Sequence, residues 1–181
     1  MKKNSMKTLS VLLLAFMALP VRLLAQDADD SKLISDCNDA KAAFVKSDGF
    51  MKSLFDNSYG YVIFPNVGKG AVAVGGAAGN GIVFEKGNTI GKASMKQLTV
   101  GLQLGGQAYR EVIFFETKAA LDRFKEDKFE FAAQVSAVAA NSGVSADAKY
   151  KEGVMVFSQE KGGLMYEAAV GGQKFDFTAF K

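Results

Sequence analysis

Single basic residues that stand beside glycines or aromatic residues are the part of this sequence best suited to binding chemistry. They are Lys69, Lys86, Lys92, Lys96, Arg110, Lys161 and Lys174. Cations at the rim of an apolar sheet can hold a phospholipid headgroup, while phenylalanine and methionine side chains contact the interfacial region of the bilayer. We therefore predict a lipid-binding site. Its candidate residues are Lys69, Lys92, Lys96, Arg110 and Lys161.

The residues required by the common catalytic mechanisms are missing from the sequence. The chain has 181 residues and no histidine, so it lacks the usual general base and the usual zinc ligand. Its one cysteine, Cys37, excludes an intramolecular disulfide and any multi-cysteine metal site. The acidic pairs Glu126-Asp127 and Asp29-Asp30 lie in polar segments that we expect to be solvated. We predict a protein that is not an enzyme and uses no metal or cofactor.

The N-terminal segment predicts a secretory signal peptide over residues 1–25. Lysines without any acid come first, and a nearly continuous apolar run over residues 9–19 follows. Pro20 and Arg22 interrupt this run before it reaches the roughly 20 residues that a membrane-spanning helix needs. We expect cleavage near Gln26 and export to the periplasm or envelope, with release from the cell as a further possibility.

Removal of the signal peptide changes the charge of the chain. The whole sequence has 22 lysines and arginines against 19 acidic residues, and residues 1–25 contain four of the basic residues and none of the acidic ones. The remaining residues, 26–181, have a net charge of −1 and are the right number for one domain. Nucleic-acid binding requires a concentrated basic surface, so we predict no nucleic-acid partner.

Hydrophobic periodicity predicts the elements that position the basic residues. Apolar residues at helical spacing predict an N-terminal amphipathic helix over 29–45, and Thr117 is a suitable cap for a second helix over 117–128. Short β-branched and aromatic runs predict strands over 61–64, 71–74, 81–84, 98–104, 112–115, 129–139, 154–157, 164–170 and 175–177. The short connections between them favour antiparallel pairing, which makes the fold class α+β.

A weak internal repeat suggests how the sheet is shaped. Residues 72–78 and 102–108 each place a glycine pair after an alternating apolar stretch, at an interval of 30 residues. Glycine permits bulges and close backbone approach. The repeat therefore predicts a strongly curved, glycine-rich antiparallel sheet, sandwich-like or barrel-like, with one inserted helix.

Several ordered segments resemble the SYLF-domain family of lipid-binding proteins, in its secreted bacterial form. They are GYVIFPNVGKG at 60–70, VGLQLGGQ at 100–107, FFETKAALDRF at 114–124 and KGGL at 161–164. The resemblance covers residues 33–177 and implies binding of phosphoinositides or of phospholipids in general. Relatives in the eukaryotic cytoplasm bind actin through accessory regions, so actin is an unlikely partner for an exported chain. This sequence departs from the family pattern at residues 92–96, often an aromatic-proline segment, and at Arg110, usually an acidic position.

These observations together predict an exported, non-enzymatic domain over 26–181 that binds phospholipid and associates peripherally with envelope membranes, favouring anionic headgroups. Two alternatives remain at this stage. One is a small integral outer-membrane β-barrel, which the helices expected at 29–45 and 117–127 oppose. The other is a protein-interaction scaffold of the envelope, which the sequence does not separate from a lipid-binding domain.

Overall fold

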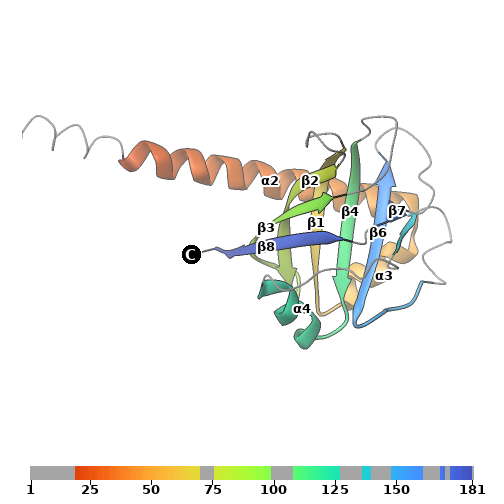
Figure 1. Ribbon diagram of the computed structural model, residues 1–181. Coiled ribbons are helices and arrows are strands. Elements are labelled where there is room, and N and C mark those ends of the chain that lie inside the picture. The colour runs from red at the N-terminus through yellow and green to blue at the C-terminus, as the bar shows by residue number, and fades with distance from the viewer. Residues whose placement is uncertain are drawn as a thin grey trace, which may run out of the picture. The chain divides into compact units, whose positions relative to one another are not determined.

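The computed structural model describes residues 19–69, 76–98, 108–126, 136–139, 148–160, 168–169 and 172–180. Its helices are α2 (Leu19–Ser47), α3 (Phe50–Asn57) and α4 (Lys118–Lys125), shown in Figure 1. Its strands are β1 (Gly60–Lys69), β2 (Gly76–Glu85), β3 (Asn88–Leu98), β4 (Ala108–Phe115), β5 (Ser136–Ala139), β6 (Val154–Glu160), β7 (Ala168–Ala169) and β8 (Gln173–Ala179). The chain divides into two compact units, Met1–Ser35 and Asp36–Lys181. The sheet lies entirely within the second unit.

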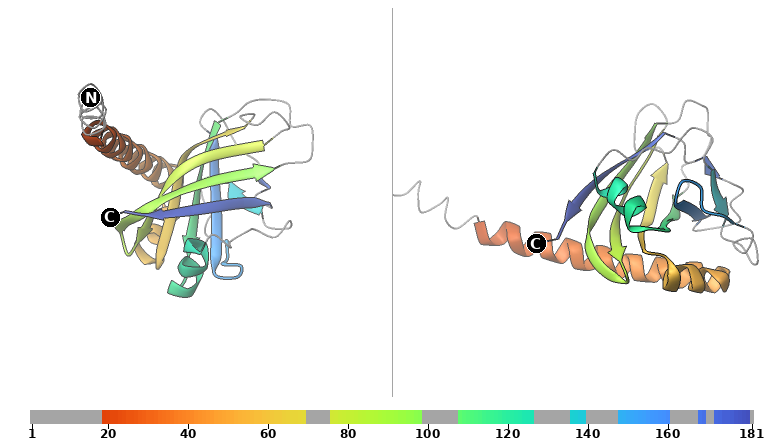
Figure 2. Two further views of the ribbon diagram at one scale, coloured as in Figure 1. Left: turned by 60° about the vertical axis from the view of Figure 1, so that its left-hand side comes forward. Right: turned by 90° about the horizontal axis from the view of Figure 1, so that it is seen from below.

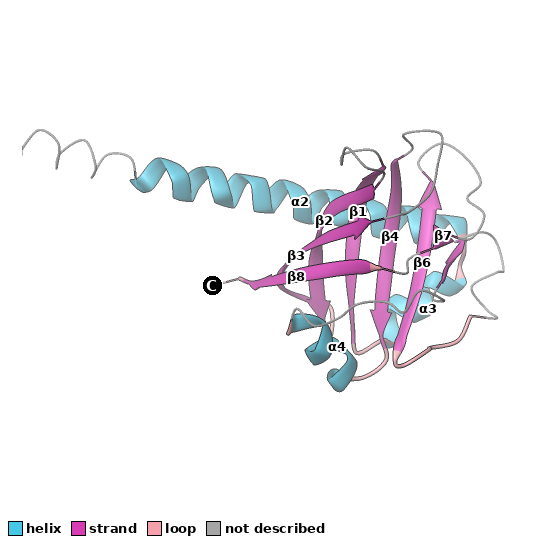
Figure 3. Cartoon of the chain, viewed as in Figure 1, coloured by secondary structure: helices cyan, strands magenta, loops and turns pink. Residues whose placement is uncertain are grey.

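All the described strands join one sheet in the order β7-β5-β6-β4-β1-β2-β3-β8 (Figure 3). The six strands from β6 to β8 pair antiparallel, as predicted, while β5 runs parallel to β6. The sheet is neither closed nor strongly curled, so the predicted sandwich or barrel shape is wrong. Helices cover both of its faces, and a second sheet is therefore not needed to bury its apolar side chains.

One face of the sheet packs against α3 and the Asp36–Ser47 part of α2, and we call it the helix face. The Cys37 thiol donates a hydrogen bond to the Ile63 carbonyl at 3.3 Å. The Phe55 ring meets Tyr61 and Phe114 edge-on, with ring centroids 5.0 Å and 4.9 Å apart. These contacts bury the apolar half of the helix face. Cys37 itself is completely buried on the apolar side of α2.

The opposite face, called the inner face, packs against α4. The Phe124 ring lies 5.0 Å from Phe115 on β4 and 5.1 Å from Phe175 on β8, measured between centroids. Thr117 caps the helix as predicted, because its hydroxyl accepts a hydrogen bond from the Ala120 amide at 3.3 Å. Figure 2 shows α3 and α4 on opposite sides of the sheet. The inserted helix thus completes the main hydrophobic core.

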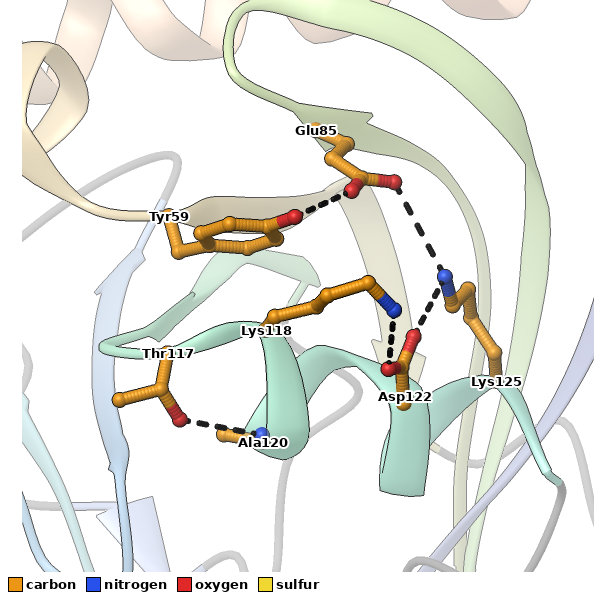
Figure 4. A network of polar contacts seen from close by, with 7 residues as sticks. All are labelled: Tyr59, Glu85, Thr117, Lys118, Ala120, Asp122 and Lys125. Atoms are coloured by element: carbon orange, nitrogen blue, oxygen red, sulfur yellow. Dashed lines mark hydrogen bonds and ion pairs between the residues drawn. The ribbon is translucent and has the colours of Figure 1, made fainter.

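A chain of polar contacts fastens α4 to the start of the sheet (Figure 4). The Tyr59 hydroxyl donates to Glu85 at 2.7 Å, and the other carboxylate oxygen of Glu85 lies 3.8 Å from the Lys125 ammonium. Lys125 also pairs with Asp122 at 2.8 Å, and Lys118 pairs with the same aspartate at 2.5 Å. This network orients α4 but is open to solvent in part, so we expect the aromatic contacts to contribute most of the packing energy.

Strand β3 is the main element that the sequence did not predict. Its residues alternate between polar side chains and small or flexible ones, so the usual β-branched signal is missing. The predicted strand 71–74 lies outside the described residues, as do all of 98–104 except Leu98 and the first part of 129–139. Of the repeated glycine pairs, only Gly76 lies within the description, at the first position of β2.

Candidate functional site

The helix face has a polar half that the helices of the second unit do not bury. Asn66, Asn80, Ser94 and Asp176 are successive register partners on β1, β2, β3 and β8. Partners in antiparallel strands point to the same face, so these residues form a polar row across the sheet. Asn66, Asn80 and Asp176 are exposed, and Ser94 is half-buried. Polar contacts with solvent or a ligand are therefore available along the whole row.

Four cations surround this row, and we call them the basic face. They are Lys92 and Lys96 on β3, Lys174 on β8 and Arg110 on β4. Lys96 and Lys174 are exposed, whereas Lys92 and Arg110 are half-buried. Among the described strand residues of this surface, these four cations stand against a single carboxylate, Asp176.

Strand geometry gives the dimensions of the basic face. Lys92 and Lys96 lie about 13 Å apart along β3, since a strand rises about 3.3 Å per residue. Strand β4 lies three strands away from β3, about 14 Å at the usual spacing of about 4.8 Å, and Arg110 lies two residues along β4 from Ala108, the residue level with Lys96. Gly68 and Ala78, both half-buried, occupy the register positions between β4 and Lys96. Because these two residues are small, they leave room for a bulky anionic group between Lys96 and the strand that carries Arg110.

Lys96 and Lys174 are direct register partners on neighbouring strands. Like charges placed opposite each other destabilise a sheet, unless an anion or solvent screens them. The neighbouring pair has the opposite character, because the Ser94 hydroxyl donates to the Asp176 carboxylate at 3.2 Å. The lysine pair therefore concentrates positive charge at one end of the polar row.

Arg110 is held in place by a neighbour on β6. Its guanidinium donates a hydrogen bond to the Gln159 side-chain oxygen at 2.9 Å, and the two residues are register partners. Because the guanidinium has five N–H donors, this single bond positions the group without using its capacity for an anion.

The structure brings three of the predicted site residues, Lys92, Lys96 and Arg110, onto one face. Lys92 and Lys96 lie inside a strand rather than at the strand ends or turns that the sequence suggested. Lys69 is the last residue of β1, and only its backbone is described, paired with Ala77. Lys161 lies outside the described residues. The role of all these residues in binding stays a prediction.

Lys174 belongs with the basic face, but the predicted site did not include it. Its place opposite Lys96 depends on the pairing of β3 with β8, which are far apart in the chain. Alternation along β8 was the available signal, because Gln173 and Phe175 are buried while Lys174 and Asp176 are exposed. The sequence shows Lys174 among the isolated cations, but it does not give the register of β8 that places this residue opposite Lys96.

The four residues of the basic face lie on strands and not on a helix. In the part of the chain that the structure describes, no helix combines the length and apolar character required to cross a bilayer.

Comparison with known proteins identifies the family to which this chain is similar. Residues 96–178 match the Ysc84 family model, described as "Las17-binding protein actin regulator". The chain is also similar to Beta cell expansion factor A of Aeromonas veronii, with 32% identity over 126 residues, which is 68% of this chain and 48% of the relative. The chain thus spans about half the length of this curated relative.

The chain belongs to the Ysc84, or SYLF, domain family, as the sequence resemblance predicted. This family is linked to lipid binding and is generally non-catalytic. The family match contains the end of β3 from Lys96 onward, all of β4 and α4, and most of β8. It therefore includes Lys96, Arg110 and Lys174 of the basic face, whereas Lys92 lies before it.

Proposed function

We propose that this protein is an exported, non-enzymatic phospholipid-binding domain that associates peripherally with anionic envelope membranes. The observation that carries the proposal is the basic face, where Lys92, Lys96, Arg110 and Lys174 gather on one side of the sheet. The family's link to lipid binding supports the same ligand. The described family activity of actin regulation concerns a partner that an exported domain does not meet, so a phospholipid surface is the partner we propose.

The proposed mechanism is local electrostatic attraction. With residues 1–25 removed, the chain has a net charge of −1, so its overall field does not draw it to an anionic surface. Each cation held near such a surface contributes about 1 kcal/mol. The basic face therefore supplies a few kcal/mol in a protein that is otherwise nearly neutral. Three residues at which the chain departs from the family pattern, Lys92, Lys96 and Arg110, contribute to that charge.

Vesicle co-sedimentation tests the proposal. Protein over residues 26–181 is expected to bind vesicles that contain phosphatidylglycerol better than vesicles of phosphatidylcholine alone. Changing Lys92, Lys96 and Arg110 together to glutamine removes about 3 kcal/mol of attraction, which weakens binding by about two orders of magnitude. Binding is expected to fall partly as salt rises above about 0.1 M, where the Debye length is about 10 Å.

The matched control changes three exposed lysines elsewhere, Lys46, Lys149 and Lys151, to glutamine. This variant loses the same charge and should bind nearly as well as the parent protein. Equal losses in both triple variants would indicate a general charge effect and refute the basic face as the site. No binding to any vesicle at low salt would refute lipid binding and favour the envelope scaffold.

Export requires a separate experiment. The signal pattern over residues 1–25 leads us to expect that protein recovered outside the cytoplasm begins at or near Gln26, as measured by intact mass. High salt should release the membrane-bound fraction, because the proposed attachment is peripheral. A full-length mass outside the cytoplasm would contradict cleavage, and retention of the protein after salt and alkaline extraction would contradict peripheral attachment.

A further inference from the structure

The inner face contains a buried polar cluster that packing alone does not account for. Its members come from four strands: Gln97 on β3, Tyr109 and Glu111 on β4, Ser158 on β6 and Gln173 on β8. All of them are at least 95% buried, and Glu111, Ser158 and Gln173 have no exposed surface. The cluster lies on the opposite face of the sheet from the basic face, so it is a separate site.

Register and hydrogen bonding bring these side chains together. Glu111 is the register partner of Ser158, and Gln97 is the register partner of Gln173. The Gln173 side-chain nitrogen donates to Glu111 Oε2 at 3.0 Å, although β8 and β4 are not adjacent in the sheet. The contact therefore crosses the inner face and joins the two halves of the cluster.

Three oxygen atoms of the cluster have no hydrogen-bond partner among the described residues. They are Glu111 Oε1, Ser158 Oγ and Gln173 Oε1. Covalent geometry places the Gln173 oxygen within about 5 Å of Glu111 Oε2, because the oxygen and nitrogen of one amide share a carbon. Ser158 is the register partner of Glu111, so the three atoms belong to neighbouring side chains of the cluster. A buried polar atom without a partner is costly, so three such atoms in one cluster indicate that a polar partner group is missing.

We infer that Glu111, Ser158 and Gln173 form a binding site for a primary ammonium group. An ammonium has three N–H donors and one positive charge. These match three unpartnered oxygens and one carboxylate, and the resulting hydrogen bonds would be charge-assisted. The ammonium can belong to a free aliphatic amine or to the ethanolamine headgroup of a lipid, and the chemistry is the same for both.

Other occupants fit the site less well. A water molecule can pair with all three oxygens, because the Ser158 hydroxyl can donate to it, but neither water nor a hydroxyl group supplies the positive charge that would balance an ionised Glu111. Calcium and magnesium require six or more oxygen ligands and usually several carboxylates. Glu111 is the carboxylate of this trio, and the described residues contain no group of three acidic, cysteine or histidine side chains that could hold a metal.

The ionisation of Glu111 gives the site a recognisable signature. Burial raises the pKa of Glu111 from 4.5 to about 7, although the hydrogen bond from Gln173 opposes this rise. The other described titratable groups on this part of the inner face are Tyr109, whose pKa burial also raises, and Glu160 on β6. Ammonium binding near pH 7 should therefore release a proton from Glu111.

The test uses n-hexylamine as the probe and the thermal midpoint of the mature protein at pH 8 as the readout. Hexylamine should raise the midpoint, whereas tetramethylammonium, which has charge but no N–H, and hexanol, which has a donor but no charge, should not. Glu111→Gln should weaken hexylamine binding at least about tenfold, and Ser158→Ala should weaken it less. Calorimetry at pH 7 should show proton release that depends on Glu111.

A second arm separates the two sources of ammonium. Vesicles of phosphatidylethanolamine are compared with phosphatidylcholine vesicles, using the parent protein and the Glu111→Gln variant. A preference for ethanolamine vesicles that this substitution abolishes assigns a lipid ligand, and a response to hexylamine alone assigns a free amine. Equal hexylamine binding by parent and variant overturns the inference, as does a comparable midpoint shift with tetramethylammonium or hexanol. Neither failure bears on the basic face, which the lysine and arginine variants test.

Discussion

Replacing Glu111 with glutamine should make the protein less sensitive to pH. The folded protein raises the pKa of this carboxyl from 4.5 to about 7, chiefly by burial. The folded state thus holds the proton more tightly than the unfolded chain. The stability that the folded protein gains by holding this proton is complete below pH 4.5. It is lost as the pH rises through about 7.

The size of this loss follows from linkage. Each unit of difference in pKa between the folded and unfolded states corresponds to about 1.36 kcal/mol, so ionisation of Glu111 costs the folded protein about 3 kcal/mol by pH 8.5. Glutamine has nearly the same shape and no charge, and therefore avoids this cost. The unfolding free energy of Glu111→Gln minus that of the parent should rise by about 3 kcal/mol between pH 4.5 and pH 8.5.

Urea unfolding followed by far-ultraviolet circular dichroism is the suitable assay, because the chain has no tryptophan to report on tertiary structure. The difference in unfolding free energy between variant and parent is measured at several pH values. Any effect of the amide that does not depend on pH then cancels. Glu116→Gln, at an exposed carboxyl on the loop before α4, provides the control and should show a nearly constant difference. A constant difference for Glu111→Gln as well would refute the conclusion that its burial is costly.

Three further substitutions or reactions test the packing. Gly81→Ala should lower the free energy of unfolding in urea by roughly 1–3 kcal/mol, because a Cβ there would meet the Ile63 carbonyl and lie 2.8 Å from the Phe64 ring. The control variant Gly49→Ala should be nearly neutral, because its Cβ would meet nothing within 4 Å. Phe124→Ala should cost roughly 3–5 kcal/mol by the same measurement, and a loss below about 1 kcal/mol would show that α4 adds little to the core. Burial raises the pKa of Cys37 to about 12, so the native protein should resist maleimide at pH 7 until it is unfolded; rapid labelling of the folded protein would contradict this.

Much of the fold could be predicted because local signals and burial agree. The Thr117 cap, followed by Leu121 and Phe124, identified α4, and the apolar runs identified parts of β1, β2, β4, β6 and β8. These segments are buried, so their sequences are apolar enough to recognise. Their antiparallel pairing also followed from the short connections between them.

The basic face was harder to predict because it depends on an unrecognised strand and on long-range register. Lys92, Ser94 and Lys96 present a polar side of β3, and Ala93 and Met95 give its buried side only a weak signal. Without β3, nothing in the sequence places Lys174 opposite Lys96. The sequence does not predict the buried cluster for a related reason, because Glu111 stands beside apolar residues and its partner Gln173 is on a distant strand.

The pairing of β3 with β8 also determines when the basic face is completed during folding. Lys96 and Lys174 become neighbours only after the last strand of the chain has docked, across a separation of nearly eighty residues. Such non-local pairing is slow to form, and an edge strand is easily released. A partly synthesised, truncated or frayed chain therefore lacks half of the lysine pair. Under the proposed function, the membrane affinity of the basic face would therefore require that β8 has paired with β3.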